Sequence, residues 1–197
     1  DKIPDIYPNY KSITIPYNIA PLNFAYTMEG EAFVTELQGD GQTLVTKGKE
    51  ARWNIKRWHQ FIEANKGKKV KINTYAKTGE GWVKYRTMMW TIAEEPIDPY
   101  ISYRIIAPSY VTYEELSIRQ RNLANFDESM IYNNMLHCTD EEGQCINCHS
   151  YKNYKTDNMQ FHVRQYKGGT MLVTDGEVKK INLKTDSTIS AGVYPAW

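Results

Sequence analysis

The sequence lacks the features that define several common classes of protein. None of its apolar runs approaches the ~20 residues that a membrane-spanning helix needs, and its formal net charge over 197 residues is only +1. It has 3 cysteines, too few for the disulfide framework of a small secreted domain. We find no glycine-rich phosphate loop and no nucleophile elbow. These absences argue against a membrane-embedded chain, a nucleic-acid-binding protein and an enzyme of a familiar class.

Aromatic residues are plentiful, with 15 Tyr, 5 Trp and 5 Phe, as is typical of β-rich proteins. Apolar and polar residues alternate over residues 31–37, 42–46 and 69–77, and Gly39-Asp40-Gly41 is a hairpin turn signal. A further long strand is expected over residues 82–93. We therefore predict a mainly β fold that begins with an Ig-like β-sandwich.

Two other segments complete the first part of the chain. Residues 1–23 are rich in proline and form an arm, with a short edge strand over residues 11–17. Apolar residues at helical spacing predict a helix over residues 54–66, ended by Gly67. Glu94 to Tyr100 reads as a linker, because two prolines favour extended backbone there. We expect one domain over residues 1–95 and a second over residues 96–197.

The second domain is expected to be a small α+β module. A strand over residues 101–107 precedes two predicted helices, over residues 113–123 and 127–136, the latter capped by Asp127. Near the end, Asp175-Gly176 lies between two alternating apolar segments. This pattern is the strongest local signal for a β-hairpin.

The most specific motif is Cys145-Ile146-Asn147-Cys148-His149. Two thiols three residues apart, followed directly by histidine, form the attachment sequence of a c-type haem. Each sulfur joins one vinyl group, and His149 ligates the iron from the proximal side. The flanking residues read as a loop. The motif predicts covalent haem c bound by Cys145, Cys148 and His149.

A second axial ligand would come from the residues that follow. His162 is the favoured candidate, and a His149/His162 pair gives six-coordinate iron of low potential. Met159 is the alternative, which would raise the potential. Arg164 can donate to a haem propionate.

The same residue types suit zinc. In that alternative a closed tetrahedral site is formed by Cys138, Cys145, Cys148 and a histidine, either His149 or His162. A disulfide or free thiols are the remaining interpretations. In the haem interpretation, Cys138 has no role.

Several phrases resemble a known group of proteins. They are Ile19–Phe24, Ile97–Tyr100, Arg119–Leu123, Phe126–Ser129, Asn147–Ser150, Phe161–Arg164 and Gly168–Thr170. They are similar to the N-terminal region of secreted Bacteroidetes-type TolB-like (PD40, WD40-like) β-propeller proteins. The resemblance implies that Tyr194–Trp197 begins a first propeller blade and that the C-terminus is truncated. It also supports Cys145, Cys148, His149, His162 and Arg164 as one unit.

Together these observations predict an extracytoplasmic haem-bearing module for electron transfer or redox sensing, working with a protein partner. Haem attachment is completed outside the bacterial cytoplasm, so a periplasmic or outer-membrane (surface) lipoprotein of a Gram-negative bacterium is expected. The alternative is a non-redox module that binds glycan or protein, with the Cys/His site a structural zinc or disulfide site. Exposure of Trp53, Trp82 or Trp90 would favour that alternative, and burial would remove the argument.

Overall fold

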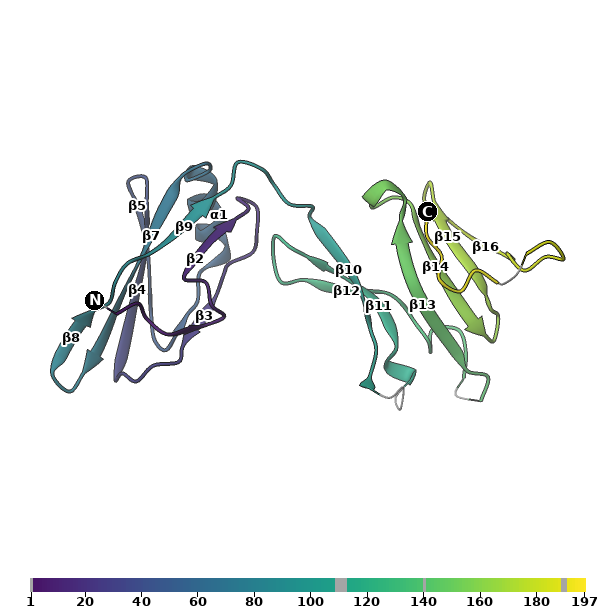
Figure 1. The fold of residues 1–197 in the computed structure, drawn as a ribbon, viewed down its shortest axis with the longest axis horizontal. Helices are drawn as coiled ribbons and strands as arrows, with labels where there is room; N and C mark the ends of the chain where they lie inside the picture. Colours follow the sequence, from purple (N-terminus) through teal and green to yellow (C-terminus); the bar gives the residue numbers. More distant parts are fainter. Residues whose placement is uncertain (1, 109–112, 140, 189–190) are drawn as a thin grey trace. The chain divides into compact units, whose positions relative to one another are not determined.

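The computed structural model describes residues 2–108, 113–139, 141–188 and 191–197. These residues form a mainly β protein with four sheets and one short α-helix (Figure 1). The chain divides into two compact units, residues 1–100 with 122–127 and residues 101–121 with 128–197. None of the described helices is long and apolar enough to cross a membrane.

The first unit contains two sheets and the helix. Its elements are β1 (Ile6–Tyr7), β2 (Ser12–Ile15), β3 (Phe24–Tyr26), β4 (Ala32–Gly39), β5 (Gln42–Lys47), β6 (Glu50–Ala51), α1 (Ile55–Ala64), β7 (Lys69–Thr78), β8 (Gly81–Lys84) and β9 (Met88–Ile92). The larger sheet has the order β2-β9-β7-β4-β5, with β8 also paired to β7. Strands β1, β3 and β6 form the smaller sheet.

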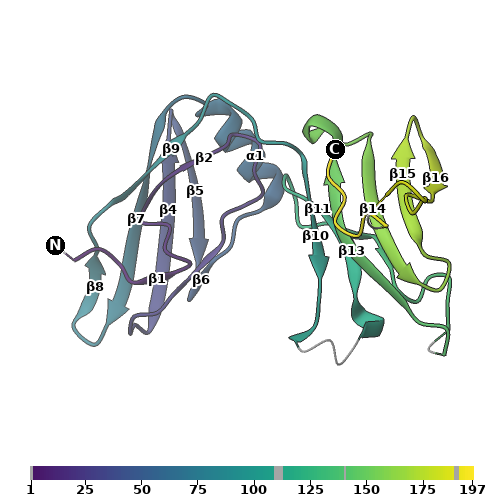
Figure 2. The same ribbon diagram turned by 45° about the vertical axis from the view of Figure 1, so that its right-hand side comes forward.

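Both the smaller sheet and α1 pack on one face of the larger sheet (Figures 1 and 2). Alternate residues of the large sheet point to this core, among them Phe33, Leu37 and Ile72, which are buried. The helix contributes Trp58 and Phe61. The expected β-rich first part is thus confirmed, although a helix supplies part of the layer that a second sheet would form in a sandwich.

Local signals account for the helix and for one hairpin. The Asn54 side chain accepts a hydrogen bond from the Arg57 N–H at 3.1 Å, which caps the helix N-terminus. The predicted turn at Gly39-Asp40-Gly41 joins β4 to β5, as expected. Strand β2, within the predicted arm, lies at the edge of the larger sheet, as expected.

The expected single strand over residues 82–93 is wrong, because the structure divides it into β8 and β9. Both strands pair with β7, but with different parts of it. Trp82 lies opposite Lys77, whereas Trp90 lies opposite Val70. A break between the two strands lets them pair in succession along the ten residues of β7.

The second unit contains the remaining two sheets. Its elements are β10 (Tyr100–Ile105), the 3-10 helix η2 (Tyr113–Glu115), β11 (Ser117–Asn122), β12 (Glu128–Asn133), β13 (Gln144–Tyr151), the 3-10 helix η3 (Lys152–Tyr154), β14 (Met159–Gln165), β15 (Gly169–Thr174) and β16 (Glu177–Ile181). The sheet orders are β10-β11-β12 (Figure 1) and β13-β14-β15-β16 (Figures 1 and 2). The predicted C-terminal hairpin is confirmed as β15 and β16. Its turn residues Asp175 and Gly176 have φ of 53° and 76°, as a type I′ turn requires.

Both helices predicted for the second unit are wrong. Residues 117–122 and 128–133 are instead the antiparallel strands β11 and β12, with Ile118 opposite Tyr132. Both side chains are buried with Ile146, Phe161 and Val163 of the neighbouring sheet. Asp127 caps no helix, because a strand follows it. Its N–H donates to the Asn125 side chain at 2.7 Å in the turn between the two strands. The described part of this unit has no α-helix, so the α+β expectation is corrected to β.

The tip of this hairpin belongs to the first unit. The carbonyl oxygen of Leu123 accepts a hydrogen bond from the Ala20 N–H at 2.7 Å. The carbonyl oxygen of Ala124 lies 2.7 Å from Nε2 of His59. The predicted boundary at residue 95 does not account for residues 122–127, which belong to the first unit although they follow the boundary.

Candidate functional site

The Cys-Ile-Asn-Cys-His motif lies within β13, so its expected place in a loop is wrong. Strand β13 is an edge strand of its sheet and pairs antiparallel with β14. Ile146 lies opposite Val163, and His149 lies opposite Phe161. Asn147 and Cys148 therefore share the one position opposite His162, which makes a β-bulge in the middle of the motif.

The register decides which motif side chains share a face. Residues directly opposite each other in an antiparallel pair point to the same side, and successive residues point to opposite sides. His149 therefore shares the core face with Phe161, whereas His162 lies on the opposite face. Cys145 lies opposite Arg164, on the same face as His162. The structure does not bring His149 and His162 together.

The two histidines have different surroundings. His149 is partly buried, and its Nε2 lies 2.8 Å from the Ser102 hydroxyl. Burial lowers the pKa of His149 below its ordinary value; a hydrogen bond to the Ser102 backbone opposes this, and the nearby Arg104 guanidinium lowers the pKa further. His162 is buried, with Nδ1 3.1 Å from the Thr170 hydroxyl. Burial also lowers the pKa of His162, with a contribution from Arg164.

These positions do not fit a c-type haem while β13 and β14 are paired. Haem attachment requires both thiols and the adjacent imidazole to converge on one macrocycle. Here Cys145 and His149 point to opposite faces of the sheet. Met159 does share the face of His149, but it is buried in the core beside Phe161. Haem ligation by these residues would require β13 to leave its sheet.

The thiols are also separate from one another. None of the three cysteines forms a disulfide, and Cys148 is exposed. Cys145 Sγ accepts a hydrogen bond from Arg164 at 3.2 Å, and Cys138 donates to the Asn134 carbonyl at 2.7 Å. Three residues of extended strand span roughly 10 Å, too far for a disulfide between Cys145 and Cys148. Within the described ranges, no three His, Cys, Asp or Glu side chains are grouped as a metal site would require, so the zinc set is not assembled.

The exposure of the tryptophans bears on the alternative of a binding module. Trp53 and Trp90 are buried, at 7% and 0% exposure. Their indole N–H groups donate to the carbonyl oxygens of Leu22 and Tyr10, so these two rings have structural roles. Trp82, in contrast, is 56% exposed. Of the three rings whose exposure would favour a binding module, only Trp82 meets the condition.

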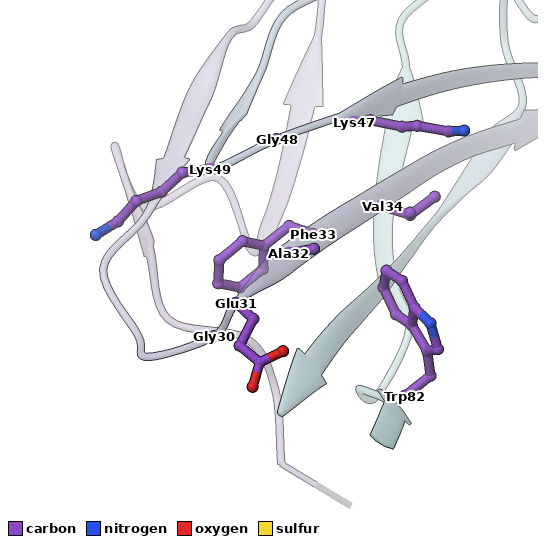
Figure 3. A pocket seen from close by; sticks show the side chains of 9 residues that line it. All are labelled: Gly30, Glu31, Ala32, Phe33, Val34, Lys47, Gly48, Lys49 and Trp82. Atoms are coloured by element: carbon purple, nitrogen blue, oxygen red, sulfur yellow. The ribbon is translucent and has the colours of Figure 1, made fainter. Parts of the chain in front are cut away.

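Trp82 lines a surface pocket of about 450 Å³ (Figure 3). The other lining residues are Gly30, Glu31, Ala32, Phe33, Val34, Lys47, Gly48 and Lys49. In Figure 3 the indole of Trp82 extends toward Val34, and the Lys47 and Lys49 side chains extend from the neighbouring chain segment. The pocket thus combines one large aromatic surface with charged groups at its margin, an arrangement suited to an amphipathic ligand.

Sequence reasoning singled out Trp82 but missed its charged neighbours. Glu31 precedes β4, whereas Lys47 and Lys49 come from the end of β5 and the residues beyond it. Strand alternation was the signal that could have found Lys47, because pairing β4 with β5 places Val34 and Lys47 on one face.

Comparisons with known proteins add no assignment. No protein-family model matches the sequence, and no curated protein or solved structure matches it. The resemblance to TolB-like β-propeller proteins therefore stays a prediction, and the function has to be argued from the two units themselves.

Proposed function

We propose that the protein is an extracytoplasmic binding module that takes a saccharide on the first unit. The single observation that carries this proposal is Trp82, which is 56% exposed over a pocket while Trp53, Trp58 and Trp90 are buried. Within the proposal, the first unit is a relative of the Ig-like sandwiches, because two sheets enclose its core. The second unit and its cysteines have no part in the binding step.

The chemistry of the pocket suits a sugar. One face of a pyranose ring is lined by C–H groups, which pack against an indole, while its hydroxyls need hydrogen-bond partners. Trp82 supplies the flat apolar surface. Glu31 and Lys47 supply an acceptor and a donor at the same pocket.

We expect Trp82→Ala to weaken saccharide binding at least tenfold, about 1.4 kcal/mol, because the stacking surface is removed. Isothermal titration against the best ligand from an array of neutral and acidic polysaccharides measures the change. Tyr154→Ala is the matched control, because Tyr154 is 92% exposed in the second unit and lies outside the pocket. Wild-type protein that binds no saccharide, or a Trp82→Ala variant that binds as the wild type does, would contradict the proposal.

A c-type haem-bearing module for electron transfer or redox sensing is the second candidate. The Cys145–His149 spacing and the exposure of Cys148 favour it, whereas the β13–β14 register opposes it. In this candidate haem joins the chain before β13 pairs with β14, and the protein is periplasmic or a surface lipoprotein. Its redox partner would be a second protein.

A pyridine haemochrome assay separates the two candidates. The protein is exported by a host with c-type maturation machinery and then extracted with acid acetone. From the register we expect a colourless protein with three titratable thiols. A c-type spectrum that survives extraction, and is lost in the Cys145→Ala/Cys148→Ala variant, would establish the haem-bearing module instead.

A further inference from the structure

We infer that the ligand of the first unit is an acidic polysaccharide, one that carries carboxylate or sulfate groups, and this inference rests on the proposed function. It comes from the face of the large sheet opposite the core. Trp82 lies on that face because it pairs with Lys77, the neighbour of the buried Ala76. The remaining positions of the face follow from the same register.

Two adjacent rows of side chains cross this face. In the first row Lys47, Val34, Tyr75 and Lys84 lie opposite one another across β5, β4, β7 and β8. In the second row Ala32, Lys77 and Trp82 follow one another across β4, β7 and β8. At the usual spacing of strands, the first row is roughly 14 Å long. Together the two rows place two aromatic rings, Tyr75 and Trp82, among three lysines, which leaves room for a chain of sugars.

The charge on this face is one-sided. Its strand positions include five lysines, namely Lys47, Lys69, Lys71, Lys77 and Lys84, and one carboxylate, Glu36. All five lysines are exposed. Lys77 is paired with Glu31 at 3.1 Å, but the other four have no carboxylate within 4.0 Å in the described part of the chain. Because the whole chain has a formal net charge of only +1, this concentration of positive charge is local. It attracts an anion and raises the rate of its association.

The kind of positive charge favours a polysaccharide over a nucleic acid. The strands β4, β5, β7, β8 and β9 contain no arginine, the residue that pairs with phosphate in a bidentate manner. Lysine instead acts as a point charge on a flexible chain, which suits carboxylates or sulfates spaced along a sugar polymer. The Glu36 carboxylate is held by the Tyr75 hydroxyl at 3.3 Å and by the Gln38 amide at 3.2 Å, so it is already engaged within the face.

The test compares polygalacturonate with its methyl ester, which has the same backbone without the charge. Heparin provides the sulfated ligand, and single-stranded DNA provides a different polyanion.

We expect wild-type protein to bind polygalacturonate or heparin at least tenfold more tightly than the methyl ester. The affinity should fall as salt is raised, because the contacts are exposed ion pairs. Lys71→Gln/Lys84→Gln should weaken the acidic ligand at least fivefold and leave binding of the methyl ester unchanged, because both lysines lie on this face but neither lines the pocket. Lys179→Gln/Lys184→Gln, in the second unit, is the charge-matched control, and circular dichroism checks that each variant folds.

The outcomes distinguish this inference from the proposed function. Equal binding of polygalacturonate and its methyl ester, lost in Trp82→Ala, overturns the acidic ligand and keeps the saccharide-binding module. Absence of binding to every polysaccharide overturns both. Tighter binding to single-stranded DNA than to either acidic polysaccharide also overturns both, and assigns the face to nucleic acid.

Discussion

Replacing Trp58 by alanine is expected to destabilise the first unit by about 4 kcal/mol. Trp58 is fully buried where α1 meets the large sheet. Its ring packs edge-on against Trp90 at 6.2 Å between centroids and lies 6.3 Å from Trp53. Its indole N–H donates to the Ile19 carbonyl at 2.9 Å. The variant therefore leaves a cavity and an unpaired carbonyl in one step, and urea unfolding followed by far-UV circular dichroism measures the loss.

Gln60→Ala is the control for Trp58→Ala, because Gln60 lies exposed on the same helix. Its effect should stay within about 0.5 kcal/mol. Hydrogen exchange by mass spectrometry should show the loss of protection in residues 1–100 of the Trp58→Ala variant. A change below about 1 kcal/mol would show that α1 is not packed as described.

Replacing Asn65 by alanine is expected to cost about 2 to 3 kcal/mol. Asn65 is fully buried at the end of α1 and joins the helix to the β4–β5 turn. Its Oδ1 accepts from the Asp40 N–H at 2.8 Å, and its Nδ2 donates to the Phe61 carbonyl at 2.8 Å. Without the amide both backbone groups lose a partner. The shift of the urea midpoint measures the cost, with the exposed Asn9→Ala variant as the control.

Gly39 provides an independent check on Asn65. A Cβ at Gly39 would lie 2.2 Å from Oδ1 of Asn65, so Gly39→Ala should destabilise the wild type. In the Asn65→Ala background that clash is absent, and the two effects should therefore not add. Additive effects would mean that Gly39 and Asn65 do not touch. Gly41→Ala is not a matched control, because Gly41 has a φ of 67° that favours glycine.

Short-range sequence patterns were sufficient to predict much of the first unit. The alternation over residues 31–37 and 69–77, and the glycines around Asp40, correspond to β4, β7 and the β4–β5 turn. The helical spacing before Gly67 corresponds to α1. In each case one face of the element is buried, so periodicity and packing agree.

Prediction failed where pairing between strands overrides local preference. Residues 113–123 contain Glu, Leu, Arg and Gln, which favour a helix, yet residues 117–122 form β11. The deciding contact is Ile118 opposite Tyr132, fourteen positions along the chain. The Asn125 and Asp127 turn between the strands was the available signal for a hairpin.

The motif shows a different limit of sequence reasoning. The Cys145–His149 spacing indicates which atoms are near one another along the chain, but not which face each one points to. That depends on the pairing of β13 with β14 and on the bulge at Asn147 and Cys148. Sequence alone grouped His149 with His162, whereas the register separates them. By contrast, the rows of lysines beside Trp82 become visible only when four strands are aligned.

The central claim, that the outer face of the large sheet around Trp82 binds a saccharide, is tested most directly by ¹⁵N NMR of the whole protein during titration with oligogalacturonate. The chain has 5 Trp, so five indole N–H signals report on burial and binding together. We expect the Trp82 indole signal and the backbone amides of β4, β7 and β8 to move, while the hydrogen-bonded Trp58 and Trp90 indole signals and the amides of β13 to β16 stay in place. Shifts confined to the second unit, or a spectrum that does not change, would contradict the account.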